Sequence, residues 1–226
     1  MIVSIVSENP DHRVLQKAVD FLQQDKVLAI PTDTNWAYAA DLLSKNGINK
    51  LYTLKNYARA KHCSLLCQDI SQASRYAVIS DSAYRRIHKL LPGPYTFIFP
   101  PKNALPRTIR DYRKDQQIGV RIPQSKICSA LAERLGHPLI ITTIPPAQIL
   151  GLDDEDGGGE GPGLESKTMP FNAYQIAEAV QNKVDLILDP GEVSLEGSST
   201  VVDFSQEPAQ IIRLGQGKID QIVGLF

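Results

Sequence analysis

Residues 27–34 read Val-Leu-Ala-Ile-Pro-Thr-Asp-Thr, and Asn-Trp-Ala-Tyr-Ala-Ala follows at 35–40. Four apolar residues closed by Pro31 are typical of a buried strand that leaves its sheet at the proline. The hydroxyls of Thr32 and Thr34 and the carboxylate of Asp33 then follow a strand end, where open α/β sheets usually bind their ligands. Thr and Asp are also ordinary turn formers, so a purely structural turn is the alternative interpretation.

Three further segments combine short apolar strands with turn residues, hydroxyls or a charge. Residues 91–99 place a Pro-Gly-Pro turn before Tyr-Thr-Phe-Ile-Phe, and residues 197–203 place Gly-Ser-Ser-Thr before Val-Val-Asp. Between them, residues 118–123 read Ile-Gly-Val-Arg-Ile-Pro, a strand that carries Arg121. An arginine between apolar neighbours needs a partner if it points inward, and either an internal carboxylate or a bound anion could serve.

Helical and strand patterns interleave along the whole chain, which predicts an α/β fold with a mixed sheet. We expect strands at 2–6, 27–30, 36–40, 63–67, 95–99, 118–122, 139–143, 184–188, 200–203 and 210–214. We expect helices after Asn9 and after Ser44, and at 71–77, 81–91, 125–135, 173–181 and 218–223. Asn9 is the expected N-cap of the first helix, and Gly136 the expected stop of the helix at 125–135.

The composition suits a single domain that spans 1–226, because 226 residues with 42% apolar content can bury a sizeable core. The chain holds no run of about 18 apolar residues, and its first residues lack a basic region, so we expect neither a membrane span nor a signal peptide. Cys63, Cys67 and Cys128 have no zinc-site spacing and suit a reducing, cytoplasmic location. The acidic, Gly-rich stretch 151–170 is expected to form a mobile loop.

Charge is unevenly distributed, although the net charge is only −1. Residues 45–126 contain 16 Lys and Arg against 4 Asp and Glu. Solvated charges on separate helices could explain this block. A basic face that binds phosphates or RNA could also explain it, and we favour this reading because three of the motifs above fall inside or next to the block.

The ordered motifs together resemble the YrdC/YciO-type threonylcarbamoyl-AMP synthase family, from about residue 10 to the C-terminus, and look nearest to its YciO branch. The resemblance implies a YrdC-like fold, a twisted mixed sheet with helices packed around a basic concave cleft. It also implies a reaction in which L-threonine, bicarbonate and ATP give threonylcarbamoyl-adenylate and pyrophosphate for the modification of tRNA. This chemistry brings two anions together, so it needs cations, N–H groups and Mg²⁺ that enters with ATP, rather than a protein nucleophile or a protein-ligated metal.

The family pattern suggests which residues bind the substrates. Thr32 and Thr34 match the motif that lines the threonine pocket. Lys55 matches the first residue of a basic pair, and Arg59 is the candidate for the second, because the matching position itself holds a tyrosine. Arg121 matches the arginine of an Arg-x-Pro motif, and with Lys55 and Arg59 it would offset phosphate charge.

The resemblance assigns five further residues to the nucleotide. Thr142 and Thr143 retain hydroxyls of a Ser-Thr-Ser-Ala-Asn motif. Ser199 and Thr200 match a Ser-Thr-Val-Val-Asp motif, and Arg213 matches Arg-x-Gly. Their hydroxyl and guanidinium groups are suited to phosphate oxygens, although Ser and Thr are also common in turns.

The chain departs from the family pattern at three places. Residues 36–38 read Trp-Ala-Tyr where Tyr-Gly-Leu is usual, so a glycine that permits close ligand approach is missing. Ile141 replaces the first serine of the Ser-Thr-Ser-Ala-Asn motif, and Pro145 replaces its asparagine. These changes leave two alternatives open: a non-catalytic protein that binds tRNA or double-stranded RNA, and an enzyme that hydrolyses the threonylcarbamoyl group. Arg121→Ala is expected to abolish nucleotide binding and leave the fold intact.

Overall fold

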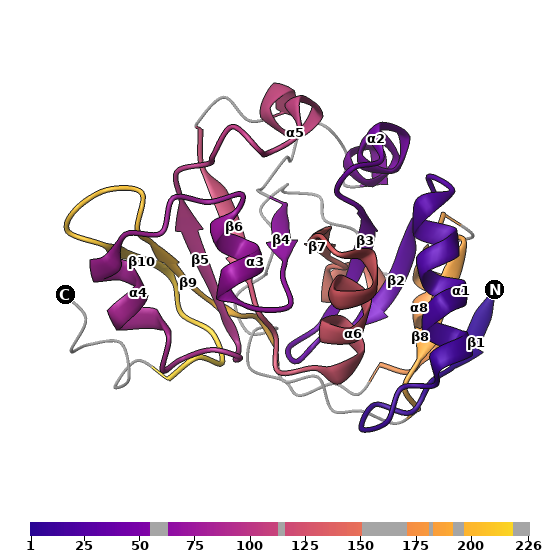
Figure 1. Ribbon diagram of the computed structural model, residues 1–226. Helices are drawn as coiled ribbons and strands as arrows, with labels where there is room; N and C mark the ends of the chain where they lie inside the picture. Colours follow the sequence, from indigo (N-terminus) through magenta and orange to yellow (C-terminus); the bar gives the residue numbers. More distant parts are fainter. Residues whose placement is uncertain (55–62, 113–115, 151–170, 181–182, 192–196, 219–226) are drawn as a thin grey trace.

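The computed structural model describes residues 1–54, 63–112, 116–150, 171–180, 183–191 and 197–218. Its strands form one sheet in the order β1-β8-β2-β3-β7-β4-β6-β5-β9-β10, with parallel and antiparallel neighbours (Figure 1). The strands are β1 (Ile2–Ser4), β2 (Leu28–Pro31), β3 (Trp36–Asp41), β4 (Ser64–Leu66), β5 (Tyr95–Phe99), β6 (Ile118–Arg121), β7 (Leu139–Thr143), β8 (Leu186–Asp189), β9 (Thr200–Asp203) and β10 (Gln210–Arg213). The mixed α/β sheet expected from the sequence is confirmed.

The helices follow the expected order with differences in length and number. They are α1 (His12–Gln23), α2 (Lys45–Leu54), α3 (Ile70–Ser74), α4 (Asp81–Ile87), α5 (Arg107–Tyr112), α6 (Lys126–Leu135), α7 (Pro146–Ile149) and α8 (Ala173–Val180). The short helices α5 and α7 were not expected, and α3 and α4 are shorter than their patterns suggested. The predicted helix at 218–223 and the predicted loop at 151–170 lie outside the described residues, apart from residue 218.

Capping residues fix the ends of two helices. The expected N-cap Asn9 is wrong: the carboxylate of Asp11 accepts hydrogen bonds from the backbone of Arg13 at 2.7 Å and of Val14 at 3.2 Å, so α1 starts after Asp11. At α6, Ser125 caps the first turn and Gly136 ends the helix with φ 73°, as the sequence predicts.

The core is divided between the two faces of the sheet, because successive strand residues point to opposite sides. Leu28 and Ile30 lie on what we call the first face, where they pack with α1 and α6. Val27 and Ala29 lie on the second face, in a cluster that includes α2 and α8. Figure 1 shows α1 and α6 packed over β2, β3 and β7. Burial on both faces explains why these strands read as continuous apolar runs.

Along β4, β6 and β5 the first face becomes small and polar. A side chain at Gly119 would approach the Ser64 hydroxyl to 2.6 Å and the Thr96 methyl group to 3.3 Å, so these three residues share a face. Arg121, two residues beyond Gly119 on the same strand, also lies on it. The pairing of Phe97 with Val120 places Thr96 opposite Arg121. The first face therefore presents a polar strip beside its apolar half.

Candidate functional site

The turn between β2 and β3 is built around the hydroxyl of Thr32. This oxygen accepts hydrogen bonds from the backbone N–H groups of Thr34 at 3.2 Å and Asn35 at 3.1 Å, and the hydroxyl donates to the Asn35 carbonyl at 2.6 Å. Thr32 is buried. The Thr32 hydroxyl thus stabilises the turn, as the structural interpretation of this segment proposed. The turn then positions Asp33 and Thr34.

Arg121 meets this turn through a buried ion pair. Its Nη2 donates to the Asp33 carboxylate at 2.7 Å and to the Thr34 hydroxyl at 2.8 Å. Only 6% of the Arg121 side chain and 8% of the Asp33 side chain are exposed. The second carboxylate oxygen of Asp33 accepts from the backbone of Gln124 at 2.9 Å. Of the two partners that the sequence allowed for Arg121, the structure shows the internal carboxylate.

The Nε–H of Arg121 is buried and finds no acceptor among the residues that the structure describes. A buried donor left without an acceptor costs on the order of 1–3 kcal/mol, more when it is charged. A substrate oxygen placed against Nε would remove that cost. This is the strongest indication of a ligand site at this point of the chain.

The segment before β9 brings a second group of hydroxyls to the same place. The Gly197 backbone donates to the Thr34 carbonyl at 3.1 Å. The hydroxyls of Ser199 and Thr96 are 2.8 Å apart, and both side chains are buried. The sequence predicted the strand that contains Thr96 but did not identify Thr96 as a site residue. The register of β5 against β6, which places Thr96 opposite Arg121, cannot be read from the sequence.

Arg213 holds the Ser199 segment in place. Its Nε and Nη2 donate to the Ser199 carbonyl at 3.2 and 3.0 Å, and Nη2 also lies 3.3 Å from the Ser199 hydroxyl. The Thr200 hydroxyl donates to the Gly217 carbonyl at 2.8 Å and accepts from the Gly215 backbone at 3.0 Å. Thr200 therefore fastens the chain after β10 to β9, while Ser199 faces Thr96.

The two threonines at the end of β7 point to opposite faces. Thr143 is exposed and pairs with Ala37 on the first face, whereas Thr142 is buried and pairs with Tyr38 on the second. The structure thus brings Thr143, and not Thr142, to the face that carries Arg121. Lys55 and Arg59 lie outside the described residues.

The departures from the family pattern have structural counterparts. Ile141 pairs with Ser64 and is buried in the apolar cluster of the first face. Pro145 is the second residue after β7, and α7 begins at the next residue. Where the family motif offers serine and asparagine side chains, this chain has apolar packing and the start of a helix.

Behind the turn lies a buried thiol. The Sγ of Cys128 is 3.4 Å from the Pro31 carbonyl oxygen. Burial raises the pKa of Cys128 to about 12, which outweighs the hydrogen bond from Ser125. A thiol with this pKa stays protonated at neutral pH and is a poor nucleophile.

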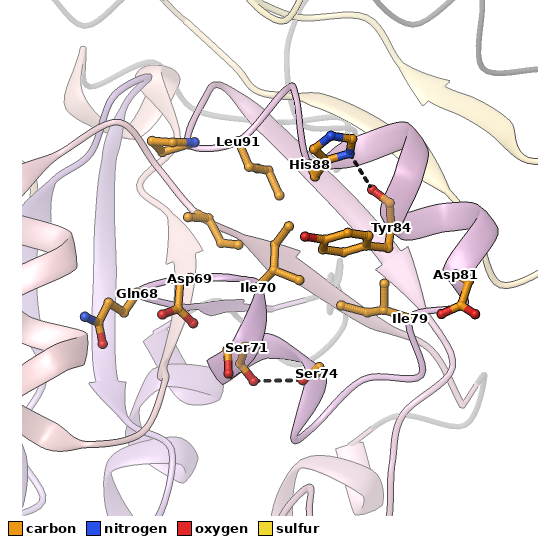
Figure 2. A pocket seen from close by; sticks show the side chains of 12 residues that line it. Gln68, Asp69, Ile70, Ser71, Ser74, Ile79, Asp81, Tyr84, His88 and Leu91 are labelled. Atoms are coloured by element: carbon orange, nitrogen blue, oxygen red, sulfur yellow. Dashed lines mark hydrogen bonds between the residues drawn. The ribbon is translucent and has the colours of Figure 1, made fainter.

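Two surface grooves flank the Arg121–Asp33 pair. One, of about 520 Å³, is lined by Asp33, by residues just before and within the first turn of α6, and by Gln68. The other, of about 670 Å³, lies between α3 and α4 and includes Ile122, the neighbour of Arg121. Figure 2 shows its apolar wall, in which the Tyr84 ring points toward Ile70. Gln68 lines both grooves, which places them side by side.

Within the described part of the chain, no three His, Cys, Asp or Glu side chains are grouped to hold a metal ion. The same residues contain no helix long and apolar enough to cross a bilayer.

The fold and the site together define an α/β protein whose candidate binding groups are an oriented arginine and several hydroxyls at strand ends. This chain belongs to the Sua5/YciO/YrdC family, whose model, described as "Telomere recombination", matches residues 20–149 and 163–215. The resemblance that the sequence motifs indicated is confirmed.

Individual relatives cover nearly the whole chain. An uncharacterized protein of Haemophilus influenzae is 30% identical over 210 residues, which span 93% of each chain. The uncharacterized protein YciO of Escherichia coli K12 is 26% identical over 94% of each chain. The threonylcarbamoyl-AMP synthase of Pyrococcus abyssi is 25% identical over 98% of this chain, which corresponds to 59% of that longer protein.

Solved structures share the fold. The crystal structure of E. coli YciO superposes with a TM-score of 0.81 at 26% identity and 98% coverage of both chains. P. abyssi Sua5 complexed with L-threonine gives a TM-score of 0.80 at 22% identity, over 100% of this chain and 60% of the other. The YrdC-like fold expected from the sequence is confirmed.

Proposed function

We propose that this protein binds L-threonine and ATP and acts as a threonylcarbamoyl-AMP synthase, using bicarbonate and releasing pyrophosphate. The observation that carries the proposal is the buried Arg121, whose orientation is fixed by Asp33 and Thr34 and whose Nε lacks an acceptor. Two comparisons with P. abyssi support it: a sequence match to a protein named threonylcarbamoyl-AMP synthase, and a shared fold with a Sua5 structure complexed with L-threonine.

The proposed chemistry requires positioning rather than covalent catalysis. The amino group of threonine attacks bicarbonate, and a carbamate forms with loss of water. A carbamate oxygen then attacks the α-phosphorus of ATP; the bond from this phosphorus to the α,β-bridging oxygen breaks, and pyrophosphate leaves. Mg²⁺ would arrive on the phosphates and offset their charge. Arg121 and the hydroxyls of Thr34, Thr96 and Ser199 would orient the substrates on the polar strip.

The apolar side chain of Ile141 is expected to make this activity slower than that of a synthase with the complete motif. It removes one hydroxyl from the face on which the nucleotide is proposed to bind, and Pro145 removes an amide. Loss of one hydrogen bond to a charged oxygen costs about 1.5–3 kcal/mol. We therefore expect Ile141→Ser to raise the rate of pyrophosphate release.

Calorimetric titration tests the binding part of the proposal. Wild-type protein should bind L-threonine, and ATP with Mg²⁺, and Ser199→Ala should weaken the binding of at least one of them. Thr53→Ala is a matched control, because its hydroxyl donates to a carbonyl within α2, away from the polar strip. Absence of heat with both ligands in the wild type would contradict the proposal.

The alternative of an RNA-binding protein has less support from the structure. The basic residues of α4 and α5, which both belong to the 45–126 block, do not form one continuous face. Since α4 precedes β5 and α5 follows it, the two helices lie at opposite ends of that strand (Figure 1). Steeply salt-dependent affinity for tRNA or duplex RNA would nevertheless restore this alternative.

A further inference from the structure

Arg121 lies on the polar strip, but the Arg121–Asp33 pair carries no net charge. Both side chains are more than nine-tenths buried, and Nη2 and the carboxylate oxygen are 2.7 Å apart. In a buried site, a charge interacts strongly with its neighbours because solvent screens it poorly. A ligand at Arg121 therefore meets the attraction of the guanidinium and the repulsion of Asp33 together.

The pair also limits which hydrogen bonds Arg121 can offer. Nη2 is already used by Asp33 and Thr34. Asp33 is held in turn, since its second oxygen accepts from the Gln124 backbone. Nε is the buried donor that remains. Both pairs of parallel N–H groups with which an arginine commonly binds phosphate include Nη2, so Arg121 cannot offer either pair while Nη2 is occupied, and Asp33 offsets its positive charge. A single N–H···O contact from Nε suits one oxygen of a carboxylate.

We infer that Asp33 is a positioning and specificity residue: it orients Arg121 and neutralises it, so that this subsite accepts a singly charged carboxylate or carbamate and rejects polyphosphate. The inference rests on the proposed function and assigns its substrates to different subsites. The amino-acid carboxylate or its carbamate lies at Arg121, and the triphosphate is bound by cations elsewhere. A polyphosphate at the pair would place several negative charges beside the buried carboxylate of Asp33, which is unfavourable.

The inference predicts an effect of opposite sign on two ligands. Asp33→Asn removes one negative charge but keeps a side-chain oxygen that can accept from Arg121. Affinity for inorganic pyrophosphate should then rise by about tenfold, from the Coulomb term of one nearby charge. Affinity for L-threonine should stay the same or fall. If Asp33 had only a structural role, Asp33→Asn would lower the affinity for both ligands.

The experiment is calorimetric titration of wild type, Asp33→Asn, Asp33→Glu and Asp20→Asn with L-threonine and with pyrophosphate at fixed ionic strength. Asp20 is an exposed carboxylate on α1, so its variant controls for the loss of one unit of charge. Asp33→Glu keeps the charge and should keep pyrophosphate binding weak while the longer side chain lowers threonine affinity. Fluorescence of Trp36, the single tryptophan, checks that each variant is folded.

The outcomes separate the inference from the proposed function. Wild type that binds L-threonine, with Asp33→Asn unchanged for both ligands, overturns the role of Asp33 and leaves the proposed function standing. An equal gain of pyrophosphate affinity in Asp20→Asn also overturns it, because the effect is then one of total charge. Wild type that binds neither L-threonine here nor ATP with Mg²⁺ in the titration of the proposed function contradicts the proposed function and the inference with it. If Asp33→Asn is unfolded, Asp33→Glu decides: tighter pyrophosphate binding overturns the inference.

Discussion

Arg121→Ala is expected to lower the free energy of unfolding by about 3–5 kcal/mol, because it leaves a buried carboxylate without its cation. Asp33 is only 8% exposed and would keep a single hydrogen bond, from the Gln124 backbone. The substitution also removes the bond to the Thr34 hydroxyl. This changes an expectation from the sequence, which held that the fold of Arg121→Ala would be intact.

A double-mutant cycle measures the pair itself. Asp33→Ala and Arg121→Ala should be less destabilising together than the sum of the two single changes, with a coupling of about 2–3 kcal/mol for a contacting, buried pair. Unfolding in urea is followed by the fluorescence of Trp36, which is fully buried, and by circular dichroism.

The exposed pair Arg107–Asp111 provides a matched control cycle. Its side chains are 87% and 67% exposed and 3.8 Å apart. Exposed pairs at this spacing contribute about 0.3–0.5 kcal/mol, so this cycle should be nearly additive. If the Arg121–Asp33 cycle is equally additive, the buried ion pair does not hold the site together and the reasoning fails.

Three further results are expected. All three cysteines are buried, and burial raises the pKa of Cys128 to about 12. In a chromogenic disulfide assay at pH 8, no thiol of the native protein should react, whereas all three should react in the denatured protein. A thiol that reacts fast in the native protein contradicts this prediction. Gly215→Ala should destabilise the protein by about 1–3 kcal/mol, because a methyl group there overlaps the Ser198 carbonyl; an unchanged urea midpoint opposes it. Ser125→Ala should cost about 1 kcal/mol through the lost cap of α6, whereas Ser125→Asn should retain most of that stability in the same assay.

Much of the fold could be read from the sequence because strands buried on both faces and capped helices leave strong local patterns. Leu28 to Ile30 form such a strand, and Ser125 with Gly136 bounds α6 as expected. The N-cap of α1 was misplaced because Asn9 and Asp11 are both good caps, and only the backbone bonds to Arg13 and Val14 decide between them.

The site was less accessible, because it depends on which face each residue takes and on contacts between distant segments. The two hydroxyls at the end of β7 look equivalent in sequence, yet Thr142 and Thr143 face opposite sides of the sheet. Arg121 was recognised as needing a partner, but a sequence cannot show that Asp33, 88 positions earlier, supplies it. Thr96 could be assigned to the site only once the register of β5 against β6 was known.

The most direct test of the proposed function is product formation. Purified protein is incubated with L-threonine, labelled bicarbonate, and ATP with Mg²⁺, and threonylcarbamoyl-adenylate is sought by mass spectrometry alongside pyrophosphate. The proposal predicts a labelled product that requires all three substrates and that falls in parallel with threonine affinity in Ser199→Ala. No product, under conditions in which a threonylcarbamoyl-AMP synthase of the same fold forms it, would contradict the proposal.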